Sequence, residues 1–171
     1  MPVTWAGHSE RIARAKVPSP HPTSRMRAAV RGMRAVAAAI ERGGKVLAVR
    51  RPETGLMAGL WELPGGERAS GEEAKDHAER ILRETTGIEV RELESVGRVE
   101  HVFTHRRLEL QIFRANAMPG ARVRTAGVTA HRWLRPDELL ELAHAGSTRK
   151  ALVLLGLCDE KSARAAGRAD S

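Results

Sequence analysis

The sequence predicts one α/β (α+β) domain, and two observations carry this prediction. Short runs rich in Val, Ile, Leu and Ala indicate β-strands, whereas residues 72–86 contain neither Gly nor Pro and indicate a helix. Strand patterns occur both before and after this helix, so the two kinds of element are mixed along the chain. The length of 171 residues is enough for a single domain with a substantial core.

Composition divides the chain into three regions. Residues 1–33 form a basic leader rich in Pro and Arg, which we expect to be disordered because it lacks a sustained apolar period. Residues 34–157 are predicted to form the folded domain, and residues 158–171 a flexible polar tail. The first 34 residues hold seven basic side chains and one acidic side chain, so most of the net charge of +8 lies in the leader. Such an arm attracts polyanions without sequence preference.

Composition also bears on location. The longest apolar runs are too short to span a bilayer, so we expect no membrane partner. The leader lacks the apolar segment of a secretory signal. Cys158 is the only cysteine, which excludes an internal disulfide and favours a reducing, cytoplasmic location.

The first predicted elements are a hairpin and a short strand. Residues 36–40 and 45–50 are β-type runs on either side of 41–44, whose sequence Glu-Arg-Gly-Gly is typical of a turn. Residues 60–63 form the next short strand, and the Pro-Gly-Gly sequence at 64–66 is expected to end it.

A helix and two further strands follow. Residues 72–86 are the predicted helix, and Gly87 stands at the position where a glycine commonly ends one. Residues 94–102 and 108–115 are predicted strands, and the second alternates apolar with polar side chains, as a half-buried strand does. Residues 103–107 connect them.

The last part of the folded region contains one strand and two helices. Residues 130–134 are the predicted strand, and Pro136 opens a short helix with acidic residues in its first turn, where the helix dipole favours them. Ser147 or Thr148 is expected to cap a final helix that runs to about Leu157.

The stretch from Gly66 to Ile88 contains the most specific motif. It resembles the signature of the Nudix superfamily, G-x5-E-x7-R-E-U-x-E-E-x-G-U, in which U is a bulky aliphatic residue. The positions that fall in register are Gly66, Glu72, Arg80, Leu82, Glu84, Gly87 and Ile88. The resemblance implies a Nudix fold, in which a mixed β-sheet is sandwiched between helices. It also implies a pyrophosphohydrolase that uses magnesium or manganese.

Two positions depart from this signature. Ile81 and Thr85 stand where the family places glutamates that face the metal ions. Residues three and four apart share one helix face, so this face retains a single carboxylate, Glu84. Magnesium prefers several oxygen ligands, and Glu84 with the carbonyl of Gly66 would be a weak site. We therefore expect no bound metal unless the protein is hydrolytically active. In that case Glu84 is the candidate catalytic residue, with magnesium or manganese as cofactor.

The scaffold positions of the signature are kept. Glu72 and Arg80 can pair and brace the loop against the helix, while Gly66 permits a close approach of the loop and Leu82 can reach the core. The predicted scaffold set is Gly66, Glu72, Arg80, Leu82, Gly87 and Ile88.

Three further stretches resemble the C-terminal domain of MutY-type adenine DNA glycosylases. Residues 50–64 are similar to that domain's RRP…GL..GLWE.P segment, residues 100–105 to its H-x-F-[ST]-H loop, and residues 147–152 to its closing helix. The resemblance covers roughly residues 35–157. In that family, the domain recognises 8-oxoguanine and does not cleave pyrophosphate.

This second resemblance implies a base-recognition site at Phe103, Thr104 and His105, which match the loop that meets the oxidised base. Arg106 and Arg107 follow and can hold phosphate. The expected ligand is damaged DNA or an oxidised purine nucleotide, in a DNA-repair context. The glycosylases' catalytic domain has no counterpart in this sequence, and a single cysteine cannot ligate their iron–sulfur cluster. A separate glycosylase subunit is therefore a candidate partner.

Three functions remain open on the sequence alone. The first is a reader of 8-oxoguanine with a degenerate Nudix signature. The second is an active hydrolase of 8-oxo-dGTP, for which Glu62, Glu67 or Glu100 would have to supply further metal ligands. The third is a partner-binding scaffold that uses the basic leader as its contact segment.

Overall fold

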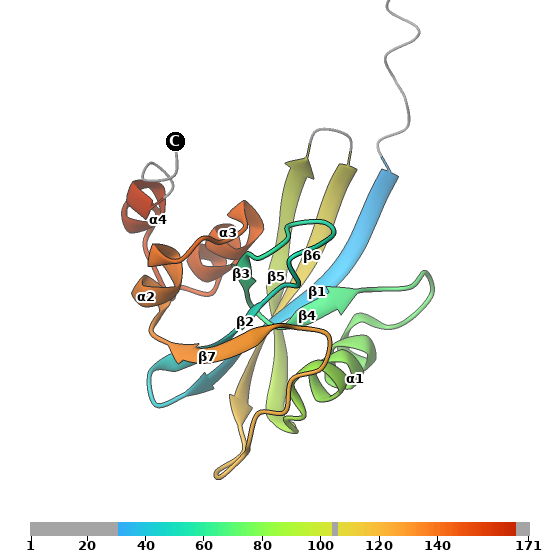
Figure 1. Ribbon diagram of the computed structural model, residues 1–171. Helices are drawn as coiled ribbons and strands as arrows, with labels where there is room; N and C mark the ends of the chain where they lie inside the picture. Colours follow the sequence, from blue (N-terminus) through green and yellow to red (C-terminus); the bar gives the residue numbers. More distant parts are fainter. Residues whose placement is uncertain (1–30, 104–105, 167–171) are drawn as a thin grey trace, which may run out of the picture.

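The computed structural model describes residues 31–103 and 106–166. In this part of the chain, one seven-stranded sheet is flanked by helices on both faces (Figure 1). The strands are β1 (Arg31–Arg42), β2 (Lys45–Arg50), β3 (Trp61–Glu62), β4 (Gly65–Glu67), β5 (Val90–Phe103), β6 (Arg106–Ala117) and β7 (Ala130–Leu134). The helices are α1 (Ala74–Thr86), α2 (Pro136–Glu141), α3 (Gly146–Leu154) and α4 (Glu160–Ala166).

The sheet is mixed, as the resemblance to the Nudix fold implies. Its main path runs β3-β2-β1-β6-β5, while β4 pairs with β1 and β7 pairs with β2. Strands β1 and β6 are parallel, from Arg31 opposite Arg106 to Glu41 opposite Asn116. The other strand pairings are antiparallel. The long parallel pair of β1 and β6 therefore lies at the centre of the sheet, and the other strands extend the sheet on either side.

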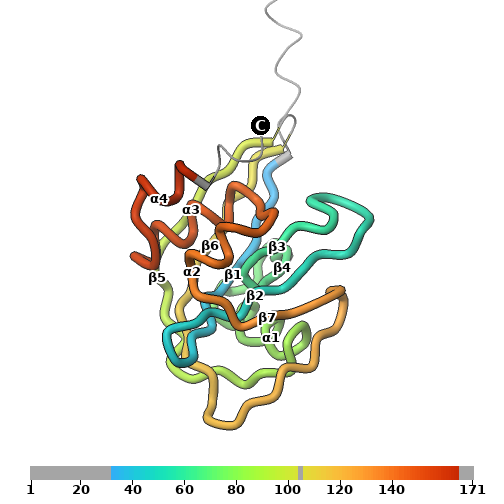
Figure 2. The backbone as a smooth tube through the Cα atoms, turned by 60° about the vertical axis from the view of Figure 1, so that its left-hand side comes forward, coloured from blue at the N-terminus to red at the C-terminus, as the bar shows by residue number. Residues whose placement is uncertain are grey.

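Alternating side chains of β1 supply both halves of the core. Val36 and Ala38 are buried on the face that α1 covers, where Leu82 packs against the sheet. Ala37 and Ala39 are buried on the opposite face, together with Leu152 of α3. Figures 1 and 2 show α1 on one side of the sheet and α2, α3 and α4 on the other. The predicted fold class, a mixed sheet between helices, is confirmed.

Several predicted elements occur with shifted ends. The hairpin of β1 and β2 turns at Gly43 and Gly44, and α1 ends at Gly87, which adopts the left-handed conformation with φ 66°. Strand β7 has the predicted bounds. Strands β5 and β6 are longer than predicted because their pairing continues to Phe103 opposite Arg106.

Strand β4 is absent from the sequence prediction, which expects Pro64-Gly65-Gly66 to end the preceding strand. Gly65 pairs with Ala37 of β1. A Cβ atom on Gly65 would overlap the carbonyl oxygen of Val36, so only a glycine lets the two strands approach this closely.

The predicted cap of the last helix is wrong. Ala145 is the N-cap of α3, and Ser147 and Thr148 lie inside its first turn with buried side chains. Residues Glu160–Ala166, within the predicted polar tail, form α4. Ala163 of this helix is 3% exposed, so apolar burial holds the segment against the domain.

The predicted disordered leader lies largely outside the described residues, because the structure is described from Arg31 onward. Pairing of β1 already begins at this residue, so the folded region starts slightly before the predicted boundary at residue 34. No helix of the described residues is long and apolar enough to cross a membrane.

Candidate functional site

The loop before α1 is braced against the helix by a group of polar side chains. Nη2 of Arg80 lies 2.8 Å from Oε1 of Glu72, and Nδ1 of His77 lies 2.7 Å from the other oxygen of the same carboxylate. The hydrogen bond from Arg80 is the main reason why the pKa of Glu72 lies below its ordinary value. The predicted pair of Glu72 and Arg80 is thus present, and buried His77 adds to it.

The helix face that the signature would use for metal is apolar at its centre. The side chain of Ile81 packs against Gly66, so closely that a Cβ atom added to this glycine would lie 2.8 Å from Cγ1 of Ile81. The hydroxyl of Thr85 donates a hydrogen bond of 2.7 Å to the carbonyl oxygen of Ile81. Its oxygen is therefore tied to the helix backbone.

The remaining carboxylate on this face does not complete a metal site. Glu84 is 54% exposed at its side chain, and Oε1 lies 3.4 Å from Nη1 of Arg80. Among the described residues, no group of three or more His, Cys, Asp or Glu side chains is arranged to hold a metal ion. Glu62, Glu67 and Glu100 therefore belong to no such group. The side chains present do not fit a resident magnesium ion, which needs near-octahedral oxygen coordination.

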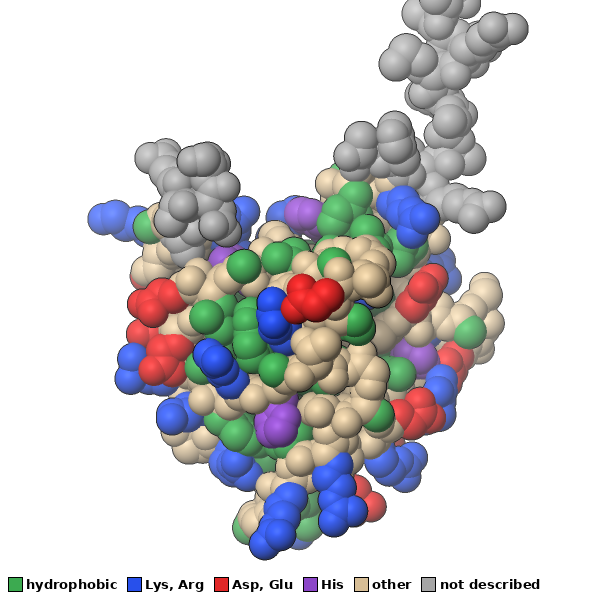
Figure 3. Space-filling model, in the orientation of Figure 1, with side chains coloured by type: hydrophobic (Ala, Val, Ile, Leu, Met, Phe, Trp, Pro, Cys, Tyr) green, Lys and Arg blue, Asp and Glu red, His purple; other side chains and the backbone are tan. Residues whose placement is uncertain are grey.

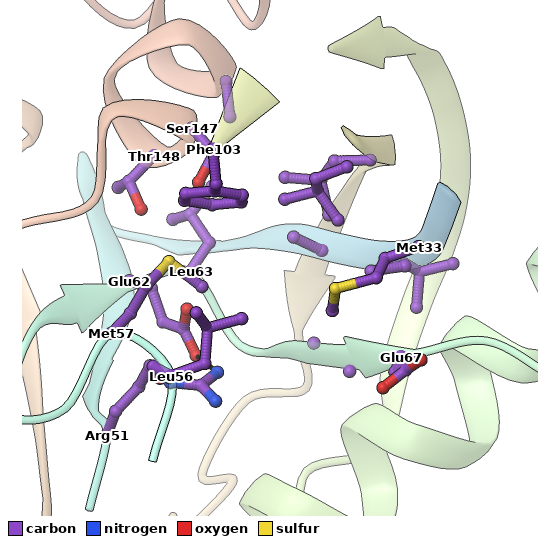
Figure 4. Close-up of a pocket in the computed structure, with 18 residues that line it drawn as sticks. Met33, Arg51, Leu56, Met57, Glu62, Leu63, Glu67, Phe103, Ser147 and Thr148 are labelled. Carbon is purple, nitrogen blue, oxygen red and sulfur yellow. Dashed lines mark hydrogen bonds and ion pairs between the residues drawn. The ribbon is translucent and has the colours of Figure 1, made fainter. Parts of the chain in front are cut away.

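A cleft of about 140 Å³ lies between the start of α3 and strands β1, β3, β4 and β6 (Figure 4), and Gly66, which contacts Ile81 of α1, is part of its lining. Phe103 at the end of β5 and the loop of residues 51–60 also contribute to its walls. Side chains that line it include Met33, Arg51, Leu56, Met57, Glu62, Leu63, Glu67, Phe103, Ser147 and Thr148. The cleft is mainly apolar, with a few polar groups at defined places, as sites for small ligands commonly are.

Polar groups face the cleft from two sides. On one side, Nη1 of Arg51 donates to Oε1 of Glu62 at 3.0 Å, and burial raises the pKa of Glu62 although Arg51 acts to lower it. On the other side, Ser147 and Thr148 of α3 are 5% and 4% exposed. No hydrogen bond joins either hydroxyl to another described residue, yet neither oxygen is among the fully buried side-chain atoms without a partner, which are Nε2 of His77 and Nδ1 of His101. Hydroxyls that line a cleft are available to a ligand.

Phe103 is held in the cleft wall by His101. The two rings meet edge to face, with centroids 4.6 Å apart. Gly146 allows α3 to approach this pair, since a Cβ atom there would lie 2.9 Å from Cε1 of His101. Burial lowers the pKa of His101, and the positive charges of Lys150 and Arg149 lower it further. A neutral histidine therefore supports Phe103 at neutral pH.

Of the other predicted recognition and phosphate-contact residues, the structure describes only Arg106 and Arg107. Thr104 and His105 lie outside the described residues. Arg106 is exposed at the start of β6, where the ends of β1, β5 and β6 project beyond the helices (Figure 1). Arg107 forms an ion pair with Glu100 of β5, which raises the pKa of Arg107 and lowers that of Glu100. Arg107 must exchange this carboxylate for a phosphate if it is to bind one.

The loop of residues 51–60 lies within the stretch that resembles the MutY-type domain, and it forms part of the site although none of its residues was predicted to. Nε of Arg51 donates to the carbonyl oxygen of Leu56 at 2.9 Å, which folds the loop back over Glu62. Met57 adopts a positive φ of 55° and lines the cleft beside Leu56. The sequence did contain a signal for this part of the site. Arg50 and Arg51 precede a loop that carries the exposed apolar residue Leu56.

Comparison with known proteins identifies relatives of two kinds. Human adenine DNA glycosylase is 30% identical over 110 residues, which is 63% of this chain and 20% of that enzyme. The chain thus spans about a fifth of the length of this relative. A putative 8-oxo-dGTP diphosphatase 2 of Mycobacterium tuberculosis is 35% identical over 105 residues, which is 61% of this chain and 74% of that protein.

Solved structures agree with the fold. The crystal structure of a MutT NUDIX hydrolase from Burkholderia pseudomallei has a TM-score of 0.66 and 25% sequence identity, and the match covers 73% of this chain and 98% of that one. The NUDIX domain family matches residues 35–154, which include α1 and all of the cleft lining except Met33. These observations confirm the resemblance inferred from the signature, and the chain belongs to the NUDIX domain family.

Proposed function

We propose that this protein recognises oxidised guanine, in DNA or as a nucleotide, and does so without cleaving pyrophosphate. The observation that carries the proposal is the contrast within α1. The brace of Glu72 and Arg80 is present, whereas Ile81 is packed against Gly66 at a position where the signature needs a metal ligand. The degenerate signature then serves as a scaffold, and the adjoining cleft is the ligand site.

The polar groups of the cleft suit the edges of a guanine base. Guanine presents N–H donors at N1 and N2 beside the O6 acceptor, and its 8-oxo form adds an N7–H donor and an O8 acceptor. The carboxylate of Glu62 can accept from two donors, and the guanidinium of Arg51 can donate to a carbonyl oxygen. The hydroxyls of Ser147 and Thr148 can act as donor or acceptor on the other side.

The projecting end of the sheet is the proposed contact with DNA. Phe103 has a flat face that can stack on a base, and Arg106 and Arg107 lie beside it on β6. Thr104 and His105 complete the loop in the sequence and are proposed to contact the oxidised base. Similarity to an adenine DNA glycosylase over a fifth of its length supports this ligand class and favours a separate glycosylase subunit as partner.

Binding of oxidised and normal DNA tests the proposal. Duplexes with 8-oxoguanine opposite adenine, and matched duplexes with guanine opposite adenine, are titrated into the full chain at several salt concentrations in the presence of EDTA. We expect the oxidised duplex to bind at least about tenfold more tightly at every salt concentration, because each mismatched polar contact costs about 1–3 kcal/mol. If the two duplexes bound with equal affinity and the same salt dependence, binding would be explained by electrostatic attraction to the basic leader, and the proposal would be rejected.

The second candidate function is hydrolysis of 8-oxo-dGTP. It is favoured by the similarity to a putative 8-oxo-dGTP diphosphatase and by the presence of Glu84 on the signature helix. A panel of normal and oxidised nucleotides with magnesium or manganese distinguishes it from the first. Release of pyrophosphate that disappears in Glu84→Gln would establish the hydrolase, whereas intact nucleotides throughout the panel would favour the reader.

A further inference from the structure

The outer edge of β5 is open in the described part of the chain. Strand β5 stands at the end of the sheet's main path, so a strand lies beside it on one side only, where β6 pairs with it. The carbonyl oxygen of Glu100 accepts a hydrogen bond of 2.8 Å from Nζ of Lys150, which indicates that it points away from β6. Alternate residues of an antiparallel strand direct their backbone groups to the same side, so those of Arg98 and Val102 also face the open edge.

Exposed apolar side chains gather along this edge. Among the described residues, the exposed large hydrophobic side chains are Leu56, Val96, Val102 and Leu154. Val96 and Val102 belong to β5, and Val102 is the most exposed of the four at 68%. Leu154 of α3 lies beside Gly97 of the same strand. The edge of β5 therefore carries apolar area that a partner could cover.

The sequence of this edge complements itself when two copies run antiparallel. Residues 96–102 have the sequence VGRVEHV, and a two-fold axis at Val99 pairs residues that are equally far from this position. Val96 of one copy then lies opposite Val102 of the other, so the two exposed valines cover each other twice.

Charge and backbone hydrogen bonding favour the same register. Arg98 of one copy lies opposite Glu100 of the other, which gives two cross-strand pairs of opposite charge. Both residues have backbone groups that face the open edge, so they meet as a hydrogen-bonded pair. Within the chain, Arg98 pairs with Glu109 and Glu100 with Arg107. A second copy would therefore extend an existing row of alternating charges.

We propose that β5 is the contact surface for a second copy of this chain, which pairs antiparallel over residues 96–102 and joins the two sheets. The contact uses the same surface on both copies, so it closes as a dimer. Lys150 must yield the carbonyl oxygen of Glu100 to a backbone N–H of the second copy. A lysine at a sheet edge opposes uncontrolled pairing, so we expect a weak dimer that depends on concentration.

Sedimentation velocity of the full chain over a range of concentrations measures this dimer. Basic and acidic side chains are spread over the face that Figure 3 shows, so the ionic strength is held fixed. We expect the dimer fraction to rise with concentration, with a Kd on the order of 50 µM.

The valines and the lysine should affect the dimer in opposite directions. Val96→Ser with Val102→Ser should weaken it at least about tenfold, because the paired apolar contacts are lost. Leu56→Ser removes a similarly exposed apolar side chain away from β5 and should leave the Kd unchanged. Lys150→Met should strengthen the dimer several-fold, because the carbonyl oxygen of Glu100 no longer has a competing donor.

Charge reversal tests the register. Arg98→Glu places glutamates opposite each other across the axis, and Glu100→Arg does the same with arginines, so each variant alone should dimerise at least about tenfold more weakly. An equimolar mixture of the two variants should restore the dimer, because each glutamate then faces an arginine of the other chain. The ion pairs within each chain are altered equally alone and in the mixture, so they cannot explain the recovery.

A wild-type chain that stays monomeric at about 0.5 mM would overturn the proposal. So would a dimer that is insensitive to the two valine substitutions, or a mixture that forms no more dimer than the single charge variants do. Thermal unfolding of each variant verifies that the fold is retained. If the valine variant does not fold, the charge-reversal mixture decides the outcome.

Discussion

The helix α1 and the cleft differ in how their polar side chains are used. At α1, Arg80 and His77 both contact the carboxylate of Glu72, which precedes the helix, and Ile81 packs against Gly66. Nε2 of His77 is nevertheless buried without a hydrogen-bond partner among the described residues. In the cleft, Ser147 and Thr148 are buried without hydrogen-bond partners in the described part of the chain. The polar groups of the first region are used in contacts with one another, whereas those of the second face a cleft that can hold a ligand. The scaffold role of the signature is thus separable from its metal chemistry.

The largest effect is expected from removing the apolar anchor of α1. Leu82 is 1% exposed, so Leu82→Ala should lower the free energy of unfolding by about 3 kcal/mol through lost burial and a cavity. Urea unfolding measures this change. Arg83→Ala, an exposed neighbour on the same helix, is the matched control and should change stability by less than about 0.5 kcal/mol. Equal effects of the two variants would show that α1 is not anchored as described.

The second effect is a gain of metal binding. Ile81→Glu with Thr85→Glu places three carboxylates, including Glu84, on one helix face, and the affinity for Mn²⁺ should rise on the order of a hundredfold. Lys75→Glu with Arg83→Glu adds the same number of carboxylates elsewhere on α1 and should not produce this gain.

Mn²⁺ titration by calorimetry or paramagnetic relaxation detects this gain. If burial of the new glutamate beside Gly66 unfolds the double variant, Thr85→Glu alone leaves the contact of Ile81 intact and should give a smaller gain. No gain in either folded variant would contradict the assigned orientation of this helix face.

The third effect concerns the cleft, where ligand binding and stability should change in opposite directions. Ser147→Ala with Thr148→Val removes two unpartnered hydroxyls, so the free energy of unfolding should stay the same or rise by about 1 kcal/mol. Affinity for 8-oxo-deoxyguanosine should fall about tenfold. Ser95→Ala removes an exposed hydroxyl on β5 and serves as the control. A variant that binds the nucleoside as tightly as the wild type would exclude these hydroxyls from recognition.

The smallest effect concerns how the contributions of Glu62 and Glu72 to the free energy of unfolding change with pH. Burial raises the pKa of Glu62 above 4.5, so its contribution to stability is present below pH 4.5 and is lost as the pH rises through the folded-state pKa. The hydrogen bond from Arg80 lowers the pKa of Glu72 below 4.5, so its contribution is present above pH 4.5 and is lost as the pH falls.

Urea unfolding of Glu62→Gln and Glu72→Gln between about pH 3 and 7 should therefore show opposite trends relative to the wild type. The stability lost in Glu72→Gln should grow with rising pH, whereas the loss in Glu62→Gln should shrink or reverse. If both variants showed the same trend with pH, the opposite pKa shifts of Glu62 and Glu72 would be contradicted.

Local patterns predicted the parts of the fold that depend on neighbouring residues. The helix end at Gly87 and strand β7 follow from turn chemistry and apolar runs, and both are found. Strand β4 could not be predicted, because its glycines disfavour a strand in isolation and pair only when β1 lies beside them.

The cleft was not predicted from the sequence, for a similar reason. Ser147 and Thr148 fit a helix-cap pattern, yet the chain places them in the first turn of α3, opposite Glu62 and close to Phe103. These residues are far apart in sequence, and only the mixed sheet brings them together. The signature predicted the brace because both of its partners lie within one segment.

The central claim is that the cleft distinguishes oxidised from normal guanine without a metal ion. Competition between the monophosphates of 8-oxo-deoxyguanosine and deoxyguanosine, measured once in EDTA and once in magnesium, tests it most directly. We predict at least about a tenfold preference for the oxidised nucleotide, equal in both buffers, with neither nucleotide consumed. No preference in EDTA, or a preference that arises only with magnesium, would contradict the account.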